Sequence, residues 1–141
     1  MKLTVPELLQ ESGSTNCQAL CAQMILHFYG DMVSMEEIMS GLESYVIGGV
    51  GMHSEGPAIW LTQRGYDVAY ITHDLEVIDR DIENITEEDV EKLKQKIEGL
   101  DHDPVNEYRL KKLRLAVDLI QAGAKYSNRI PTLSLVDELL E

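Results

Sequence analysis

Cysteine and positive charge are both scarce in this chain. Only two of its 141 residues are cysteines, Cys17 and Cys21. Two cysteines in a chain of this length do not form a disulfide framework, which indicates a reducing compartment. Twelve Lys and Arg residues stand against 25 Asp and Glu residues, so the formal net charge is −13. A general basic surface for nucleic acid or for an anionic membrane is therefore excluded, because both partners require a positive field.

Long apolar runs are absent as well. Residues 1–6 lack the apolar core and the small-residue cleavage site of a signal peptide. No stretch approaches the roughly 20 apolar residues that cross a bilayer, so we expect a cytoplasmic protein without a membrane span. No linker, repeat or low-complexity tract is visible. We therefore expect one domain over residues 1–141, which is long enough to bury a core without a metal or a disulfide.

Apolar side chains recur with helical spacing from residue 17 to residue 29. They form one broad stripe, which predicts an amphipathic helix. Asn16 or Thr15 is expected to cap this helix, and Gly30 to end it. Upstream, residues 3–10 are expected to form a short strand or a helical turn.

Capping and turn signals predict the elements that follow. Ser34 and Glu37 form a capping box, which predicts a second helix to about Leu42. Three further elements are expected, in this order: a glycine-rich loop at 48–51, a helix over 55–64 closed by Gly65, and a strand over 66–72.

The segment from residue 74 to residue 107 is strongly acidic, with thirteen acidic residues against four basic ones. Thr86 opens one amphipathic helix, and the turn at 101–104 begins another. The two helices are expected to form an αα-hairpin within a helical insertion over 74–129. A short helix is expected over 131–140. The acidic residues are interpreted mainly as solvated helix faces.

Cys17 stands at the start of the helix expected over 17–29. A thiol in the first turn faces unpaired backbone N–H groups and the positive end of the helix dipole, and both favour the thiolate. Because the thiolate is the nucleophile, Cys17 is a candidate catalytic residue. Cys21, one turn later, is expected to pack as a small apolar residue. Gln10 is a candidate hydrogen-bond donor to an oxyanion formed at the attacked carbonyl.

Simpler interpretations of the same residues stay open at this point. Cys17 can be a buried structural cysteine, and Gln10 an ordinary loop residue. Cys17 and Cys21 can be half of a zinc site, but tetrahedral zinc needs two more ligands and no suitable second pair is visible. The sequence therefore predicts no metal and no cofactor.

The run from Asn16 to Gly30 (Asn-Cys-Gln-Ala-Leu-Cys-Ala-Gln-Met-Ile-Leu-His-Phe-Tyr-Gly) resembles the nucleophile helix of the double-glycine leader peptidases. These enzymes are family thirty-nine of the papain-like cysteine peptidases and trim bacteriocin precursors. Residues 33–38 and 65–68 also resemble that family, and the cysteine helix is similar to that of papain-like effector proteases of plant pathogens. The resemblance implies a helix-rich α+β fold, the N-terminal part of a papain-like domain with an inserted acidic αα-hairpin. It further implies Cys17 as nucleophile, Gln10 as oxyanion donor, and a peptide or protein substrate.

Three features depart from that family's pattern. Gln18 follows Cys17 where the family usually has Gly, and the spacing from Gln10 to Cys17 is one residue longer than usual. The family's catalytic histidine begins a strand of the type His-Phe-Val-Val, and none of the four histidines, His27, His53, His73 and His102, has that context.

The missing histidine leaves two functions open. We expect the chain to be the first half of such a domain, incomplete at its C-terminal end: a truncated chain, a split gene or a degenerate relative. The first function is a cysteine peptidase in which the Cys17 thiolate attacks a peptide carbonyl. The alternative is a catalytically inactive papain-like module that binds a peptide or partner protein in the inherited cleft.

Overall fold

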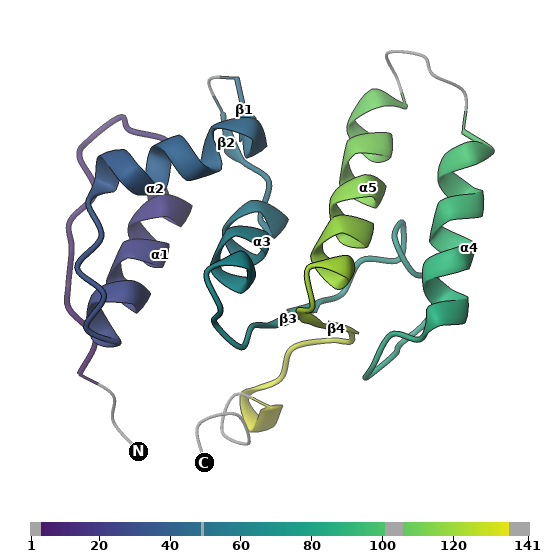
Figure 1. The fold of residues 1–141 in the computed structure, drawn as a ribbon. Coiled ribbons are helices and arrows are strands. Elements are labelled where there is room, and N and C mark those ends of the chain that lie inside the picture. The colour runs from purple at the N-terminus through teal and green to yellow at the C-terminus, as the bar shows by residue number, and fades with distance from the viewer. Residues whose placement is uncertain (1–3, 49, 101–105, 136–141) are drawn as a thin grey trace. The chain divides into compact units, whose positions relative to one another are not determined.

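The computed structural model describes residues 4–48, 50–100 and 106–135 (Figure 1). The chain divides into two compact units, Met1–Leu61 and Thr62–Glu141. Each unit contains helices and one small two-stranded sheet, so the predicted helix-rich α+β class is confirmed. A single papain-like domain over residues 1–141 stays a prediction.

The N-terminal unit consists mainly of helices. Its elements are α1 (Cys17–Phe28), α2 (Met35–Leu42), the short 3₁₀ helix η1 (Glu43–Tyr45), β1 (Val46–Ile47), β2 (Gly51–Met52) and most of α3 (Glu55–Gln63). Helices α1 and α2 pack against each other, and their buried apolar residues are Ala19, Ala22, Leu26, Ile38 and Leu42. The glycine-rich loop joins β1 to β2 in an antiparallel hairpin, which the sequence did not predict.

The ends of these helices follow the predicted signals with one difference. Ser34 Oγ accepts a hydrogen bond from the backbone N–H of Glu37 at 3.2 Å and caps α2. Gly30, with φ at +83°, ends α1 in the left-handed conformation that glycine adopts without strain. Asn16 occupies the N-cap position of α1, but its side chain makes no capping hydrogen bond. Its Oδ1 accepts instead from the Ser14 hydroxyl at 2.6 Å.

The strand or helical turn expected over 3–10 is not formed in the described part of that range. Residues 4–10 have no regular secondary structure. Leu9 is 93% exposed, so these apolar residues gain little burial that would hold a regular element in place.

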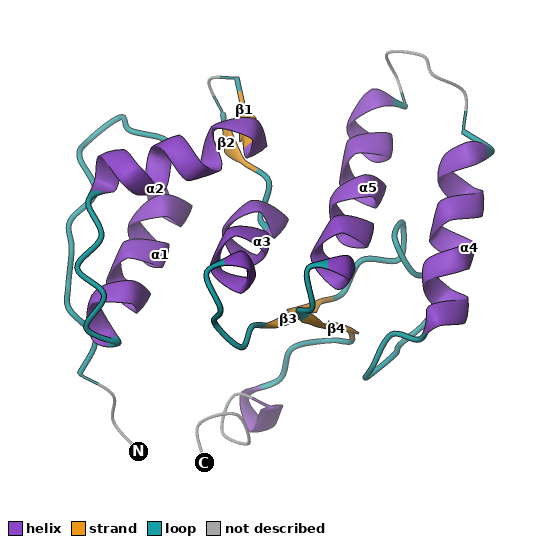
Figure 2. Ribbon diagram, viewed as in Figure 1, coloured by secondary structure: helices purple, strands orange, loops and turns teal. Residues whose placement is uncertain are grey.

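The C-terminal unit is built around a parallel pair of strands. Its elements are β3 (Ala69–Thr72), α4 (Glu87–Glu98), α5 (Glu107–Gln121) and β4 (Lys125–Asn128). Strands β3 and β4 pair in parallel from Ala69–Lys125 to Thr72–Asn128. Helices α4 and α5 lie side by side and form the predicted αα-hairpin (Figure 1). Figure 2 shows both strands in orange at one end of this hairpin.

The helical insertion expected over 74–129 contains, besides its two helices, a strand that the sequence did not predict, β4. A parallel pair requires a crossover connection, and α4 and α5 supply it between β3 and β4. The hairpin is therefore part of a β-α-α-β unit.

Of the short helix expected over 131–140, residues 133–135 are helical and Thr132 Oγ1 accepts from the Leu135 N–H at 3.3 Å. Residues 136–140 and the turn expected at 101–104 lie outside the described residues.

A buried asparagine fastens the loop after β3 to β4. Asn128 is fully buried. Its Nδ2 donates to the backbone carbonyls of Ile78 and Arg80, both at 2.9 Å. Its Oδ1 accepts from the Asp74 N–H at 2.7 Å. All the polar atoms of this amide are thus used inside the unit, in a place where water does not reach.

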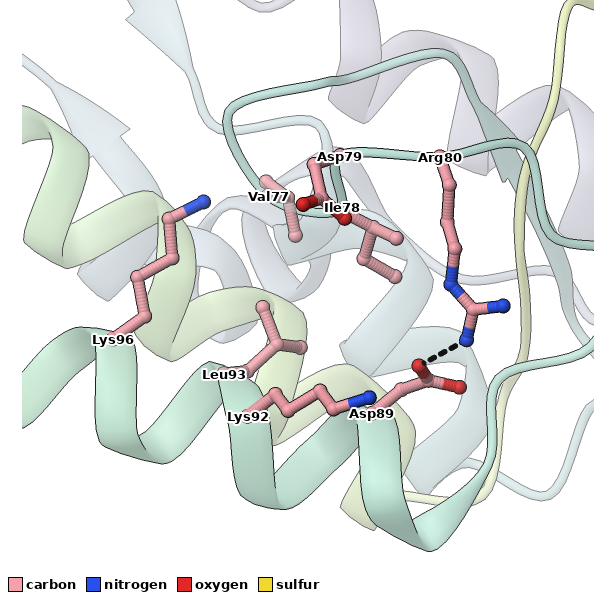
Figure 3. Close-up of a pocket in the computed structure, with 8 residues that line it drawn as sticks. All are labelled: Val77, Ile78, Asp79, Arg80, Asp89, Lys92, Leu93 and Lys96. Carbon is pink, nitrogen blue, oxygen red and sulfur yellow. Dashed lines mark hydrogen bonds and ion pairs between the residues drawn. The ribbon is translucent and has the colours of Figure 1, made fainter.

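Asp89 fixes the start of α4. Its carboxylate accepts from the Thr86 backbone N–H at 3.1 Å and from the Thr86 hydroxyl at 2.7 Å, which completes a capping box. Arg80 donates to the same carboxylate at 2.7 Å (Figure 3). Burial of Asp89 opposes ionisation, but the hydrogen bonds from Thr86 and Arg80 outweigh that effect. They hold the pKa of the Asp89 carboxyl below its ordinary value of 3.8.

This arrangement predicts an acid-sensitive contribution to stability. Because the folded-state pKa of Asp89 is depressed, its contribution is present above pH 3.8 and is lost as the pH falls below that value. We expect Asp89→Asn to lower the free energy of unfolding by about 1–2 kcal/mol at neutral pH. The difference from the wild type should shrink as the pH falls below 3.8. Urea unfolding followed by circular dichroism at several pH values measures both effects.

The control is Asp118→Asn on α5, where the carboxylate is exposed. It should leave the free energy of unfolding nearly unchanged at every pH. A constant deficit for Asp89→Asn across the whole pH range would contradict the proposed role of the charge.

Candidate functional site around Cys17

The N-terminal unit contains a pocket of about 250 Å³ between α1 and α3. Five of its residues lie on one stripe of α1 and three belong to α3 or directly precede it. They are Cys17, Gln18, Cys21, Ala22, Ile25, Ser54, Pro57 and Leu61. Most of these side chains are apolar, so the pocket suits an apolar group that is to be removed from water.

Cys17 is the first residue of α1, as the sequence predicts, and its thiol is free and exposed. The interpretation of Cys17 as a buried structural cysteine is therefore wrong. Because the Asn16 side chain makes no cap, it does not compete with an anion for the N–H groups of the first turn. A thiol at this position is accessible both as a nucleophile and as a contact for a bound ligand.

Cys21 was expected to pack as a small apolar residue, and this is wrong. Its thiol is free and exposed and lines the same pocket as that of Cys17. The reason is the direction of the helix face: α1 buries the side of Ala19 and Leu26, while Cys21 stands one turn after Cys17 on the pocket side.

Gln10 is not among the residues that line the pocket. It is exposed, and its Nε2 donates to the backbone carbonyl of Ser14 at 2.6 Å. Its amide therefore closes the loop that leads into α1. The assignment of Gln10 as oxyanion donor stays a prediction, and it requires that this hydrogen bond be exchanged.

Gln18 is a pocket residue that the sequence did not predict, and in the sequence it is noticeable only as a departure from the family's pattern. Its Oε1 is buried and has no hydrogen-bond partner among the described residues. An unsatisfied buried acceptor costs about 1–3 kcal/mol, and a ligand N–H that reaches it recovers part of that cost. The available signal was its place directly after Cys17, in the first turn of the pocket-lining stripe.

The described histidines have other surroundings. His27 Nε2 lies 3.3 Å from the Val33 carbonyl, which also accepts from Gln23 Nε2 at 3.0 Å. His73, in the C-terminal unit, lies 3.4 Å from an Asp81 carboxylate oxygen. His53 is buried and directly precedes the pocket residue Ser54. None of these three lines the pocket, and His102 lies outside the described residues.

The pocket lining, as far as the chain is described, contains neither Asp nor Glu. Within residues 4–48, 50–100 and 106–135, no three or more His, Cys, Asp or Glu residues cluster so as to hold a metal ion. No helix in these ranges has the length and apolar character needed to cross a membrane.

Comparison of the chain with protein-family models, with curated proteins and with solved structures finds no match. The resemblance to the double-glycine leader peptidases therefore stays a prediction based on residues 10–42 and 54–72.

Proposed function

We propose that the N-terminal unit is a peptide-binding module of papain-like cysteine peptidase ancestry. In this proposal the pocket beside Cys17 takes an apolar side chain of a peptide or partner protein. The observation that supports it is the composition of one pocket: apolar walls, two exposed thiols and the unpartnered Oε1 of Gln18, without a described histidine. Such a lining favours binding over hydrolysis, since peptide hydrolysis by a thiolate needs a base within hydrogen-bond reach.

The energetics of peptide binding fit this lining. Full burial of a Leu-sized side chain is favourable by about 1.5–3 kcal/mol. A backbone N–H of the bound peptide can donate to Gln18 Oε1, which is otherwise an unsatisfied acceptor. The two contributions together support an affinity that depends on one apolar side chain and one peptide N–H.

The binding proposal is tested by protection of the thiols. Iodoacetamide labelling of Cys17 and Cys21 is followed by mass spectrometry in the presence of N-acetyl-Ala-Leu-Ala-amide or N-acetyl-Ala-Ala-Ala-amide. The leucine peptide should slow the labelling of both thiols, and the alanine peptide should not. Ile25→Asp in the pocket wall should abolish protection, whereas Met32→Asp, at an exposed residue outside the pocket, should preserve it. Equal labelling with and without the leucine peptide would overturn the proposal.

A cysteine peptidase with Cys17 as nucleophile is the second candidate, and one observation favours it. Cys17 is exposed in the first turn of α1, whereas Cys21 lies a turn further along the same helix. If Cys17 is activated, it should react with iodoacetamide at about pH 6 at least roughly tenfold faster than Cys21. Rates within about threefold of each other, together with no cleavage of a peptide library, favour the binding module.

A further inference from the structure

The C-terminal unit contains a second and larger pocket, of about 440 Å³, which the proposed function does not use. It lies between the loop that follows β3 and one face of α4 (Figure 3). Its volume falls within the roughly 300–1,000 Å³ of small-molecule sites. The lining residues are Val77, Ile78, Asp79, Arg80, Asp89, Lys92, Leu93 and Lys96.

The lining has an apolar part and a charged part. Val77, Ile78 and Leu93 are all buried apolar residues and form a surface for an aliphatic group. Around them stand three cations, Arg80, Lys92 and Lys96. Figure 3 shows the side chains of α4 and those of the loop reaching into the same space. A ligand that fits this lining therefore combines an aliphatic body with an anionic group.

Arg80 has N–H donors that its hydrogen bond to Asp89 does not use. Its Nη2 donates to Asp89 Oδ1 at 2.7 Å, and a guanidinium has five N–H donors in a fixed fork. The Asp89 carboxylate is already satisfied by Arg80 and Thr86. The remaining donors of Arg80 can therefore bind a second carboxylate without competing for Asp89.

Both lysines keep N–H donors that a ligand can use. Lys92 pairs with Glu88 at 2.7 Å, and their side chains are 61% and 78% exposed. Such an exposed pair is screened by water and exchanges readily. Lys96 donates to the backbone carbonyl of Glu76, and an ammonium group has two further N–H donors. Both lysines can therefore turn toward an anion in the pocket.

The charge balance favours an anion with a single charge. Three cations and two carboxylates line the pocket, which leaves one net positive charge once Lys92 has exchanged Glu88 for the ligand. A carboxylate neutralises this charge. A doubly charged phosphate would leave an excess negative charge inside a chain whose formal net charge is already −13.

We propose that this pocket binds a carboxylate attached to an aliphatic group. The carboxylate is held by Arg80, Lys92 and Lys96, and the aliphatic group packs on Val77, Ile78 and Leu93. Two sources share this chemistry: a small free acid, and the C-terminal carboxylate of a peptide that ends in an aliphatic residue.

The ligand test uses the full chain and four probes. Amide and methyl chemical shifts are followed by NMR during titration with 4-methylpentanoate, 4-methylpentanamide, acetate and the tripeptide Gly-Gly-Leu. The carboxylate should give saturable shifts at Ile78 and Leu93, whereas the neutral amide and acetate should bind at least roughly tenfold more weakly. Saturation by Gly-Gly-Leu as well identifies a peptide C-terminus as the source, and saturation by 4-methylpentanoate alone identifies a small acid. Equal binding of acid and amide, or no saturable shift with any probe, would overturn the proposal.

The variant test compares lysines on the same helix. The double variant Lys92→Met and Lys96→Met should weaken binding of 4-methylpentanoate by roughly tenfold or more. Lys94→Met is the matched control, because Lys94 pairs with Glu91 at 2.5 Å on α4 but does not line the pocket. Arg80 is left unchanged, since its loss would leave the buried Asp89 short of a partner. If Lys94→Met weakens binding as much as the double variant, the pocket is not the site.

Discussion

Replacement of Asn128 by alanine is expected to lower the free energy of unfolding of the C-terminal unit by about 2–4 kcal/mol. The variant loses three hydrogen bonds, to the backbone groups of Asp74, Ile78 and Arg80. Asn128 is fully buried, so water does not readily replace the missing amide and these backbone groups are left unsatisfied. The loss should therefore exceed that of an ordinary single hydrogen bond.

The measurement is urea unfolding followed by far-ultraviolet circular dichroism, combined with hydrogen exchange of the Ile82 amide. That amide donates to the Asn128 backbone carbonyl at 2.7 Å and reports local opening of β4. Asn84→Ala is the matched control, because Asn84 is an exposed asparagine in the loop between β3 and α4. A stability of Asn128→Ala equal to that of the Asn84→Ala control would contradict the structural role assigned to Asn128.

The same substitution connects stability to the carboxylate pocket. Asn128 holds the carbonyls of Ile78 and Arg80, and both residues line that pocket. The segment that presents Arg80 is thus positioned by a strand residue 48 positions away in sequence. Loosening of this segment should weaken ligand binding even where the C-terminal unit still folds, since binding then has to order the loop again.

Helices were predictable in this chain because their signals are local. The Ser34 and Thr86 caps and the glycine at Gly30 lie within a few residues of the ends they define. Strand β4 was missed for the opposite reason. Lys125–Asn128 has only Tyr126 as a strong strand former, and its partner Tyr70 lies far away in sequence. The centroids of the two rings lie 5.6 Å apart, and no local sequence pattern indicates this contact.

The candidate site was predictable to a similar extent. The position of Cys17 at a helix start follows from local pattern, and the structure places it there. The partner of Gln10 depends on the loop conformation, where Gly13 adopts φ +81° and Ser14 N–H donates to the Glu11 carbonyl. Which face of α1 is covered, and hence the exposure of Cys21, depends on the packing of α2 against α1. These features require tertiary structure and could not be read from spacing.

Gly56→Ala is expected to destabilise the N-terminal unit by about 1–3 kcal/mol, although alanine is normally the better helix former by about 1 kcal/mol. A Cβ at Gly56 would lie 2.5 Å from Tyr45 Cγ and 2.6 Å from Tyr45 Cβ. Rotation of the ring does not relieve the second contact, because Tyr45 Cβ is attached to the main chain. The Tyr45 carbonyl is itself held by the His53 N–H at 2.9 Å. The clash therefore has to displace either η1 or the start of α3.

The fluorescence of Trp60, the only tryptophan, reports this effect from within α3 during urea unfolding, and far-ultraviolet circular dichroism follows the C-terminal unit, which contains the control. The control is Gly99→Ala at the end of α4, where the nearest atom to a new Cβ is the Gln95 carbonyl oxygen at 3.4 Å and φ is −81°. That variant should be neutral or stabilised by about 0.4–1 kcal/mol, because alanine restricts the unfolded chain more than glycine does. The two substitutions are chemically identical, so destabilisation is expected at Gly56 and not at Gly99. Equal stability changes would show that the contact between Gly56 and Tyr45 does not fix the start of α3, and with it the pocket wall formed by Pro57 and Leu61.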